Sequence, residues 1–417
     1  MPSQLDRRTF IRCAAAQAGL MGLAPLIRAE EGAPAANPAP PAARPQYRGP
    51  NIILVRFGGG VRRRETIDPQ HTYCPYFLHK LVPQGTFYPR MELAFSATSA
   101  DGHPFEPVTS HGEGTLNLLT GRYDEYIPVS RRYPDRYDFE LLDDRFEPRV
   151  PTLFEYLRAA YDLPPHQALT INSEDRKAEE FYSFSNHHLF GLRYKCQVLS
   201  LYRFKCHLLR RKIDAGQFTG RRLEEKQRQL AQWESLDYRN TDEGQSPQVG
   251  EFWDRWRDFY GESGLVNPRG DRLLTELAVR AIRELRPRLM MINYSDPDYV
   301  HWGNAHHYTR AIAIIDQELQ RLHETCQADE EYRDNTIFVI VPDCGRDNAR
   351  LAPVPCQHHF GDRSSHEIFA LLLGPGIARG AVVDKRVEQI AIAPTIGRIM
   401  GLRTELAEPT VLEEAIA

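Results

Sequence analysis

Five short runs of apolar and β-branched residues recur along the chain and are typical of buried strands. Continuous apolar runs of this length, without alternation of polar residues, predict strands covered on both faces, as in a parallel sheet. The runs lie at residues 51–57, 167–172, 288–294, 336–341 and 368–374.

Helical patterns separate these runs. Residues 151–161 and 272–285 repeat apolar positions with the period of a helix, and so does the segment that follows the run at 288–294. The apolar face of that last segment carries Ile312, Ile315, Leu319 and Leu322. This alternation predicts an α/β fold with a mostly parallel central sheet and helices on both faces. Ligand sites in such sheets lie beyond the carboxyl ends of the strands.

The strand pattern disappears between residues 181 and 270, where the sequence is charged and helical in character. We therefore expect a helical insertion that stands over or beside the sheet and offers a surface for a protein partner. Its basic cluster at 210–212, continued by Arg221 and Arg222, would attract an anionic substrate or form a solvated helix face. The solvated face is favoured, because Glu224 and Glu225 are close enough to neutralise the cluster.

The N-terminus places Arg7 and Arg8 ahead of a moderately apolar stretch at residues 13–27. That stretch is too short and too rich in Ala and Gly for a transmembrane span, and it ends in small residues, as a removable signal does. It resembles a twin-arginine export signal, which predicts a periplasmic or otherwise exported protein. We expect a signal peptide at 1–29, an Ala/Pro-rich linker at 30–50, and one α/β domain at 51–417 with no transmembrane span.

The composition is that of an ordinary globular protein and does not indicate a particular function. Of the 417 residues, 41% are hydrophobic and 26% are charged, as in soluble globular proteins. The formal net charge of −4 is too small to indicate nucleic acid or an anionic membrane as a partner. Seven cysteines, one of them inside the predicted signal, are too few for a disulfide scaffold.

Acidic and imidazole side chains follow the predicted strands. Asp298 and His301 come after the run at 288–294, Asp343 follows the run at 336–341, and His358 and His359 come next. One such histidine alone is more often structural. Oxygen and imidazole groups at several strand ends together predict a divalent metal site, with zinc or manganese as the ion.

Several motifs resemble, in order, those of the alkaline phosphatase superfamily, in its sulfatase-like branch. They are PNIILV, SHGEGTLNLLTGRY, DPDYVHWGN, TIFVIVPDCGRD, and HH followed by EIFALLLGPGI. The resemblance runs from about residue 51 to 401, without the helical insertion. It implies a two-metal hydrolase of phosphate, phosphonate or sulfate esters, acting on a small anionic substrate.

The resemblance assigns one metal to Asp298, His301 and either His359 or His358, and a second metal to Asp343. The second site departs from the family pattern. Residues 58–60 are three glycines where an aspartate ligand is usual, and Cys344 stands where a second histidine is usual. We therefore expect one strong metal site and a second that is weak or empty.

The expected nucleophile position also departs from the pattern, since His111 stands there, flanked by Ser110. Ser110 as nucleophile and His111 as base are the catalytic candidates, and no formylglycine motif is present. Candidate metal or anion contacts are Asp296, Cys344, Arg62 and Arg346. The alternative function is a catalytically reduced relative that binds a ligand or a partner protein at the cell envelope.

Overall fold

The computed structural model describes residues 44–99, 102–123, 126–130, 144–173, 182–234, 246–266, 269–301, 304–348, 357–358 and 362–417. The predicted signal peptide, most of the predicted linker and His359 lie outside the described residues.

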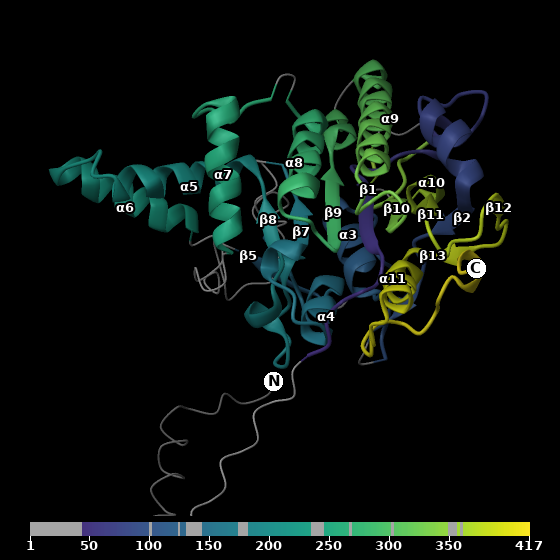
Figure 1. Ribbon diagram of the computed structural model, residues 1–417. Coiled ribbons are helices and arrows are strands. Elements are labelled where there is room, and N and C mark those ends of the chain that lie inside the picture. Colours follow the sequence, from purple (N-terminus) through teal and green to yellow (C-terminus); the bar gives the residue numbers. More distant parts are fainter. Residues whose placement is uncertain are drawn as a thin grey trace, which may run out of the picture. The chain divides into compact units, whose positions relative to one another are not determined.

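A nine-stranded sheet forms the centre of the described chain (Figure 1). Its order is β12 (Ala381–Val382), β2 (Gly85–Glu92), β11 (Glu367–Leu373), β10 (Thr336–Pro342), β1 (Asn51–Phe57), β9 (Leu289–Tyr294), β7 (Ala168–Ile171) and β8 (Gln197–Leu199), with β13 (Val387–Glu388) paired to β2. Strand β11 runs antiparallel to β10 and to β2, and the other neighbouring pairs of this sheet are parallel. The predicted mostly parallel α/β sheet is confirmed.

Helices cover both faces of the sheet, as the sequence pattern predicts (Figure 1). Alternate residues of β1 show the division, because successive side chains of a strand point to opposite faces. Ile53 and Val55 pack with α8 (Asp271–Glu284) and α9 (Ala305–Ala328). Ile52 and Leu54 pack with α3 (His111–Thr120), α4 (Leu153–Ala160) and α11 (Ile392–Met400).

The segment predicted as a helical insertion contains three helices, α5 (Leu201–Asp214), α6 (Gly220–Glu234) and α7 (Pro247–Tyr260). The segment also holds the short strand β8, which the sequence pattern does not show and which pairs with β7 at the edge of the central sheet. A three-residue strand is too short to produce a periodic signal. Helices α5 and α7 bury Phe204, Trp253 and Trp256 in the same core as α8 and α9, whereas Leu230 is the buried residue of α6.

The remaining elements are short. Two small antiparallel sheets pair β3 (Ala97–Thr98) with β4 (Pro104–Phe105) and β5 (Tyr126–Ser130) with β6 (Asp144–Pro148). The short helical turns are α2 (Arg63–Thr66), η1 (Phe77–Leu81), η2 (Val82–Gln84), η3 (Pro165–Gln167), η5 (Gly191–Tyr194), η6 (Asp296–Val300), α10 (Arg363–His366), η7 (Gln389–Ala391) and η8 (Glu413–Ala415). Among the described helices, none is both long and apolar enough to cross a lipid bilayer.

The carboxyl ends of β1, β9 and β10 lie side by side, because these three strands are parallel neighbours. The segments that leave them begin at Gly58, Ser295 and Asp343. The N-terminus of α3 reaches the same edge, where His111 contacts Asp343. This edge therefore gathers residues that are far apart in the sequence.

Candidate metal centre

Three of the predicted metal ligands meet beyond the end of β9. Asp298 lies in η6, His301 follows that turn, and His358 comes from the segment after β10. Their ligand atoms all lie within 4.8 Å of one another. The Nε2 atoms of His301 and His358 lie 2.7 and 3.2 Å from the same atom, Oδ1 of Asp298. One oxygen and two imidazole nitrogens thus converge on one point.

The hydrogen bonds of Nδ1 in His301 and His358 determine whether Nε2 carries a proton or a lone pair. Nδ1 of His358 lies 2.8 Å from the carbonyl oxygen of Thr109, and Nδ1 of His301 lies 2.8 Å from Oε1 of Gln357. The amide of Gln357 is oriented by its NH2 group, which donates to the carbonyl oxygen of His301 at 2.5 Å. Because carbonyl oxygens only accept, each Nδ1 carries a proton and donates it. With the proton on Nδ1, each Nε2 is left to direct its lone pair toward Oδ1 of Asp298.

The pKa of His358 is shifted in the direction that favours its neutral ring. Burial lowers the pKa of His358, although the nearby carboxylate of Asp298 raises it in part. A neutral ring with Nδ1 protonated turns the lone pair of Nε2 toward a carboxylate oxygen, which is also an acceptor. Histidines that bind metals usually donate their other ring nitrogen to a carbonyl or carboxylate, as both rings do here. The donor set fits a divalent ion held by three protein ligands.

Asp343 lies in a separate hydrogen-bonded group next to this cluster. Its Oδ2 accepts from the backbone N–H of Gly59 at 3.1 Å and lies 2.5 Å from Nδ1 of His111. Its Oδ1 accepts from the N–H groups of Gly60 at 3.2 Å and Cys344 at 2.8 Å. A carboxylate offers about four lone-pair positions. All four positions of Asp343 are engaged by the protein.

The carboxyl group of Asp343 is fully buried and remains ionised. Burial raises its pKa, but the interactions with His111, with the guanidinium of Arg56 and with the N–H of Gly59 outweigh burial and lower the pKa to about 2. The negative charge is therefore kept inside the protein by donors and by a buried cation.

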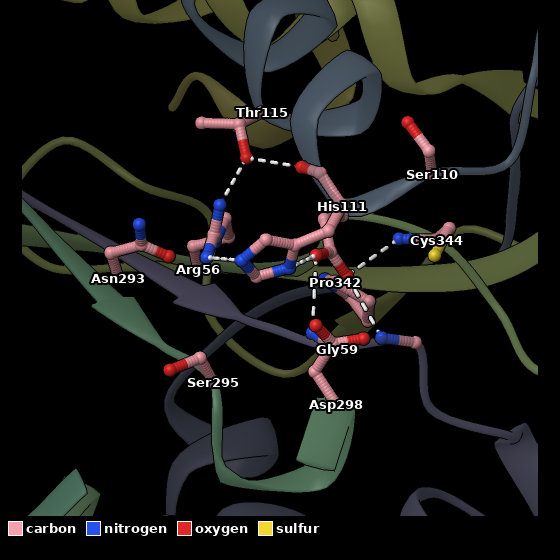
Figure 2. A network of polar contacts seen from close by, with 12 residues as sticks. Arg56, Gly59, Ser110, His111, Thr115, Asn293, Ser295, Asp298, Pro342 and Cys344 are labelled. Carbon is pink, nitrogen blue, oxygen red and sulfur yellow. Dashed lines mark hydrogen bonds and ion pairs between the residues drawn. The ribbon is translucent and has the colours of Figure 1, made fainter. Parts of the chain in front are cut away.

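Arg56 is the buried cation that sequence reasoning missed. It lies on β1 with no exposed surface, its Nη2 is 2.5 Å from Nε2 of His111, and its Nη1 donates to Oγ1 of Thr115 (Figure 2). Arginine has no acceptor, so Nε2 of His111 must accept from it. His111 is then the neutral tautomer that donates from Nδ1 to Asp343. The available signal was the one charged residue within the otherwise apolar run at 51–57.

Ser110 occupies the N-cap of α3. Its Oγ accepts from the N–H of Glu113 at 3.1 Å and donates to Oε2 of Glu113 at 2.7 Å. In Figure 2 the hydroxyl points away from Asp298. The predicted pair of Ser110 and His111 therefore stands side by side in sequence, while the two side chains contact different partners.

Two of the candidate contacts have hydrogen-bond partners outside the metal cluster. Asp296 accepts from the N–H of Asp271 at 3.2 Å and donates its own N–H to that residue at 3.0 Å, at the start of α8. Arg62 forms a two-point ion pair with Glu65, at 2.7 and 2.9 Å. Neither side chain belongs to the group formed by Asp298, His301 and His358.

Arg346 and Cys344 are both fully buried. The guanidinium of Arg346 donates to the carbonyl oxygens of Gly60 at 2.8 Å, Pro297 at 2.9 Å and Gly59. It thereby ties the segments after β1 and β9 together beneath the cluster. Burial raises the pKa of Cys344 well above its usual value, with a further contribution from Asp343, and this keeps the side chain a thiol.

Known proteins resemble this chain only distantly in sequence. No family model matches the chain. A 2,3-bisphosphoglycerate-independent phosphoglycerate mutase from Gracilaria tenuistipitata var. liui is 30% identical over 132 residues, which is 31% of this chain and 24% of that protein. The chain therefore matches about a quarter of the length of this curated relative.

Solved structures share the architecture at low sequence identity. Murine ectonucleotide pyrophosphatase/phosphodiesterase 5, in an inactive variant bound to AMP, superposes with a TM-score of 0.52, 9% identity, and coverage of 88% of this chain and 100% of that one. A putative sulfatase from Bacteroides thetaiotaomicron gives a TM-score of 0.50, 12% identity, and coverage of 85% and 72%. At these identities the similarity is one of fold, and the chain shares the fold of both proteins.

Proposed function

We propose that the protein is an exported, metal-dependent hydrolase of a phosphate, phosphonate or sulfate ester, with Asp298, His301 and His358 as the metal ligands. The observation that carries this proposal is the convergence of two Nε2 atoms on Oδ1 of Asp298, while both Nδ1 atoms donate outward. Zinc and manganese are the ions that suit this donor set.

A divalent ion held there would polarise an ester oxygen and lower the pKa of a bound water. The chain's own residues prepare the site. Thr109 and Gln357 fix the two imidazole rings, and Arg346 holds the segments that carry Gly60 and Pro297 in place. If Ser110 is the attacking group, Glu113 is the carboxylate placed to receive its proton.

The proposed substrate is a small anionic ester, and the proposed compartment is the periplasm. Arg7 and Arg8 ahead of a short apolar stretch support export by the twin-arginine route, which carries folded proteins. A metal centre assembled from separate parts of the chain suits that route, because its ligands come together only on folding.

The alternative is a relative with reduced chemistry that binds a ligand or a partner protein at the envelope. One observation favours it: both ring nitrogens of His111 are engaged, by Asp343 and by Arg56, so this histidine has no lone pair ready to act as a base. A protein partner would then contact the exposed surface of α6.

Metal analysis of the purified mature protein, combined with ester assays, tests the proposal. We expect about one equivalent of divalent metal and cleavage of nitrophenyl phosphate, phosphonate or sulfate esters. His358→Ala should lose the metal and the activity together. His323→Ala is the matched control, since His323 is a buried histidine that contacts Tyr76 instead. Metal without hydrolysis would favour the binding protein, and absence of metal would refute the proposal.

A further inference from the structure

The surroundings of Asp343 do not fit a second metal ion. Two backbone N–H groups, those of Gly59 and Gly60, point at its two carboxylate oxygens. A cation bound to Asp343 on this side would face the positive ends of two N–H dipoles. It would also have to displace donors from a carboxylate whose four positions are already used.

The glycine segment after β1 has no room for a ligand side chain. A Cβ at Gly58 would lie 1.9 Å from the carbonyl oxygen of Tyr294, and one at Gly60 would lie 2.5 Å from the carbonyl oxygen of Gly345. Gly60 also has a φ of 70°, which disfavours other residues. No aspartate fits here, so the segment can offer only its backbone N–H groups.

A side-chain cation lies near Asp343, the residue to which a second metal is assigned by resemblance. Arg56 has no exposed surface and contacts Nε2 of His111, whose Nδ1 donates to Asp343. The chain from Arg56 through His111 to Asp343 brings a fixed positive charge toward the buried carboxylate. A buried carboxylate is costly without such a partner.

We infer that the protein replaces the second metal of a two-metal site with Arg56, His111 and the glycine N–H groups, and therefore binds one divalent ion. His111 is on this account a positioning residue, which holds Asp343 and through it the glycine segment that packs against Asp298. The inference rests on the proposed function for the first metal, at Asp298, His301 and His358.

Nuclear magnetic resonance of the unaltered full protein tests the inference, and variants serve only to assign the signals. The protein is labelled with ¹⁵N at histidine, and Cd²⁺ is added to metal-free protein. His111→Gln, His301→Gln and His358→Gln assign the signals. We expect one ¹¹³Cd resonance, displaced Nε2 signals for His301 and His358, and a His111 ring that keeps its proton on Nδ1 throughout.

The outcomes separate the two proposals. Two ¹¹³Cd resonances, or direct Cd²⁺ coupling to His111, would overturn the inference and leave the first metal site intact. If Cd²⁺ moves none of the three rings, the proposed function fails, and the inferred single-ion site fails with it.

Metal counting on two variants provides an independent measurement. Asp343→Asn should still bind one equivalent of Zn²⁺, whereas Asp298→Asn should bind none. Circular dichroism establishes that each variant is folded before titration calorimetry. Loss of a Zn²⁺ equivalent in folded Asp343→Asn would contradict the inference, because Asp343 would then be a ligand.

Discussion

Gly59 lies directly against Asp298, and a Cβ at position 59 would stand 2.3 Å from the backbone nitrogen of Asp298. The φ of Gly59 is 87°, in the region that glycine alone adopts readily. The position of Asp298, the proposed metal ligand in η6, therefore depends on a residue without a side chain in a distant segment.

Gly59→Ala should weaken Zn²⁺ binding at least tenfold, because the added methyl group displaces Asp298 from the two imidazoles. Gly216→Ala is the matched control, since Gly216 has a similar φ of 68° but no heavy atom within 4 Å of its added Cβ. Titration calorimetry measures both affinities. Equal effects of the two substitutions would show that backbone strain, and not the contact with Asp298, is responsible.

Gln357→Leu should reduce metal affinity about 10- to 100-fold, since a residue that orients a ligating histidine typically contributes that much. The change removes the acceptor for Nδ1 of His301 and frees the ring to rotate. Gln84→Leu, at a partly buried glutamine that donates to the carbonyl oxygen of Lys80, should leave the Zn²⁺ affinity unchanged. An unaltered Zn²⁺ affinity in Gln357→Leu would exclude this role for Gln357.

Arg346→Met should lower the free energy of unfolding by more than about 3 kcal/mol, because several buried carbonyl groups lose a charged donor. The acceptors belong to Gly59, Gly60 and Pro297. Arg257→Met, which breaks partly exposed ion pairs with Asp258 and Asp254, should change the free energy of unfolding by less than about 1 kcal/mol. Urea denaturation of both variants provides the comparison.

Glu155 should make stability fall between about pH 4.5 and pH 7. Burial raises its pKa from 4.5 to about 7, despite hydrogen bonds from Thr152 and Ser185 that lower it. In this interval the folded state binds more protons than the unfolded state, so a rise in pH favours unfolding. The pKa shift corresponds to a decrease in the free energy of unfolding on the order of 3 kcal/mol between these two pH values.

Urea denaturation at a series of pH values, compared with Glu155→Gln, measures this contribution. The glutamine variant should be less stable at low pH, because its NH2 group faces donors, but its profile should be flatter. Exposed Glu225 provides the control, and Glu225→Gln should retain the wild-type slope. Parallel profiles for the wild type and Glu155→Gln would contradict the assignment.

Replacement of Arg7 and Arg8 by lysine should trap the precursor in the cytoplasm, because the twin-arginine route depends on the arginine pair. Fractionation and immunoblotting of the precursor and mature forms measure the effect. Arg48→Lys, beyond the predicted signal, should leave export unchanged. Normal localisation of the double lysine variant would rule out this route.

Local pattern alone determined much of the fold. The apolar runs at 51–57 and 336–341 coincide with β1 (Asn51–Phe57) and β10 (Thr336–Pro342), because a strand buried on both faces favours apolar residues at most positions. The short strand β8 escaped prediction, since it is held by pairing with β7 and not by a pattern of its own. The sequence pattern likewise predicted that Asp298, His301 and Asp343 lie just beyond strand ends.

Only the tertiary structure decided what these residues contact. The sequence places Arg56 inside an apolar strand and His111 at the start of a helix, and nothing local indicates that their side chains meet at 2.5 Å. Nor does it show that glycine N–H groups occupy both oxygens of Asp343. Propensity and periodicity act over a few neighbouring residues, whereas a hydrogen bond between positions 59 and 343 exists only after the parallel strands pair and bring their ends together.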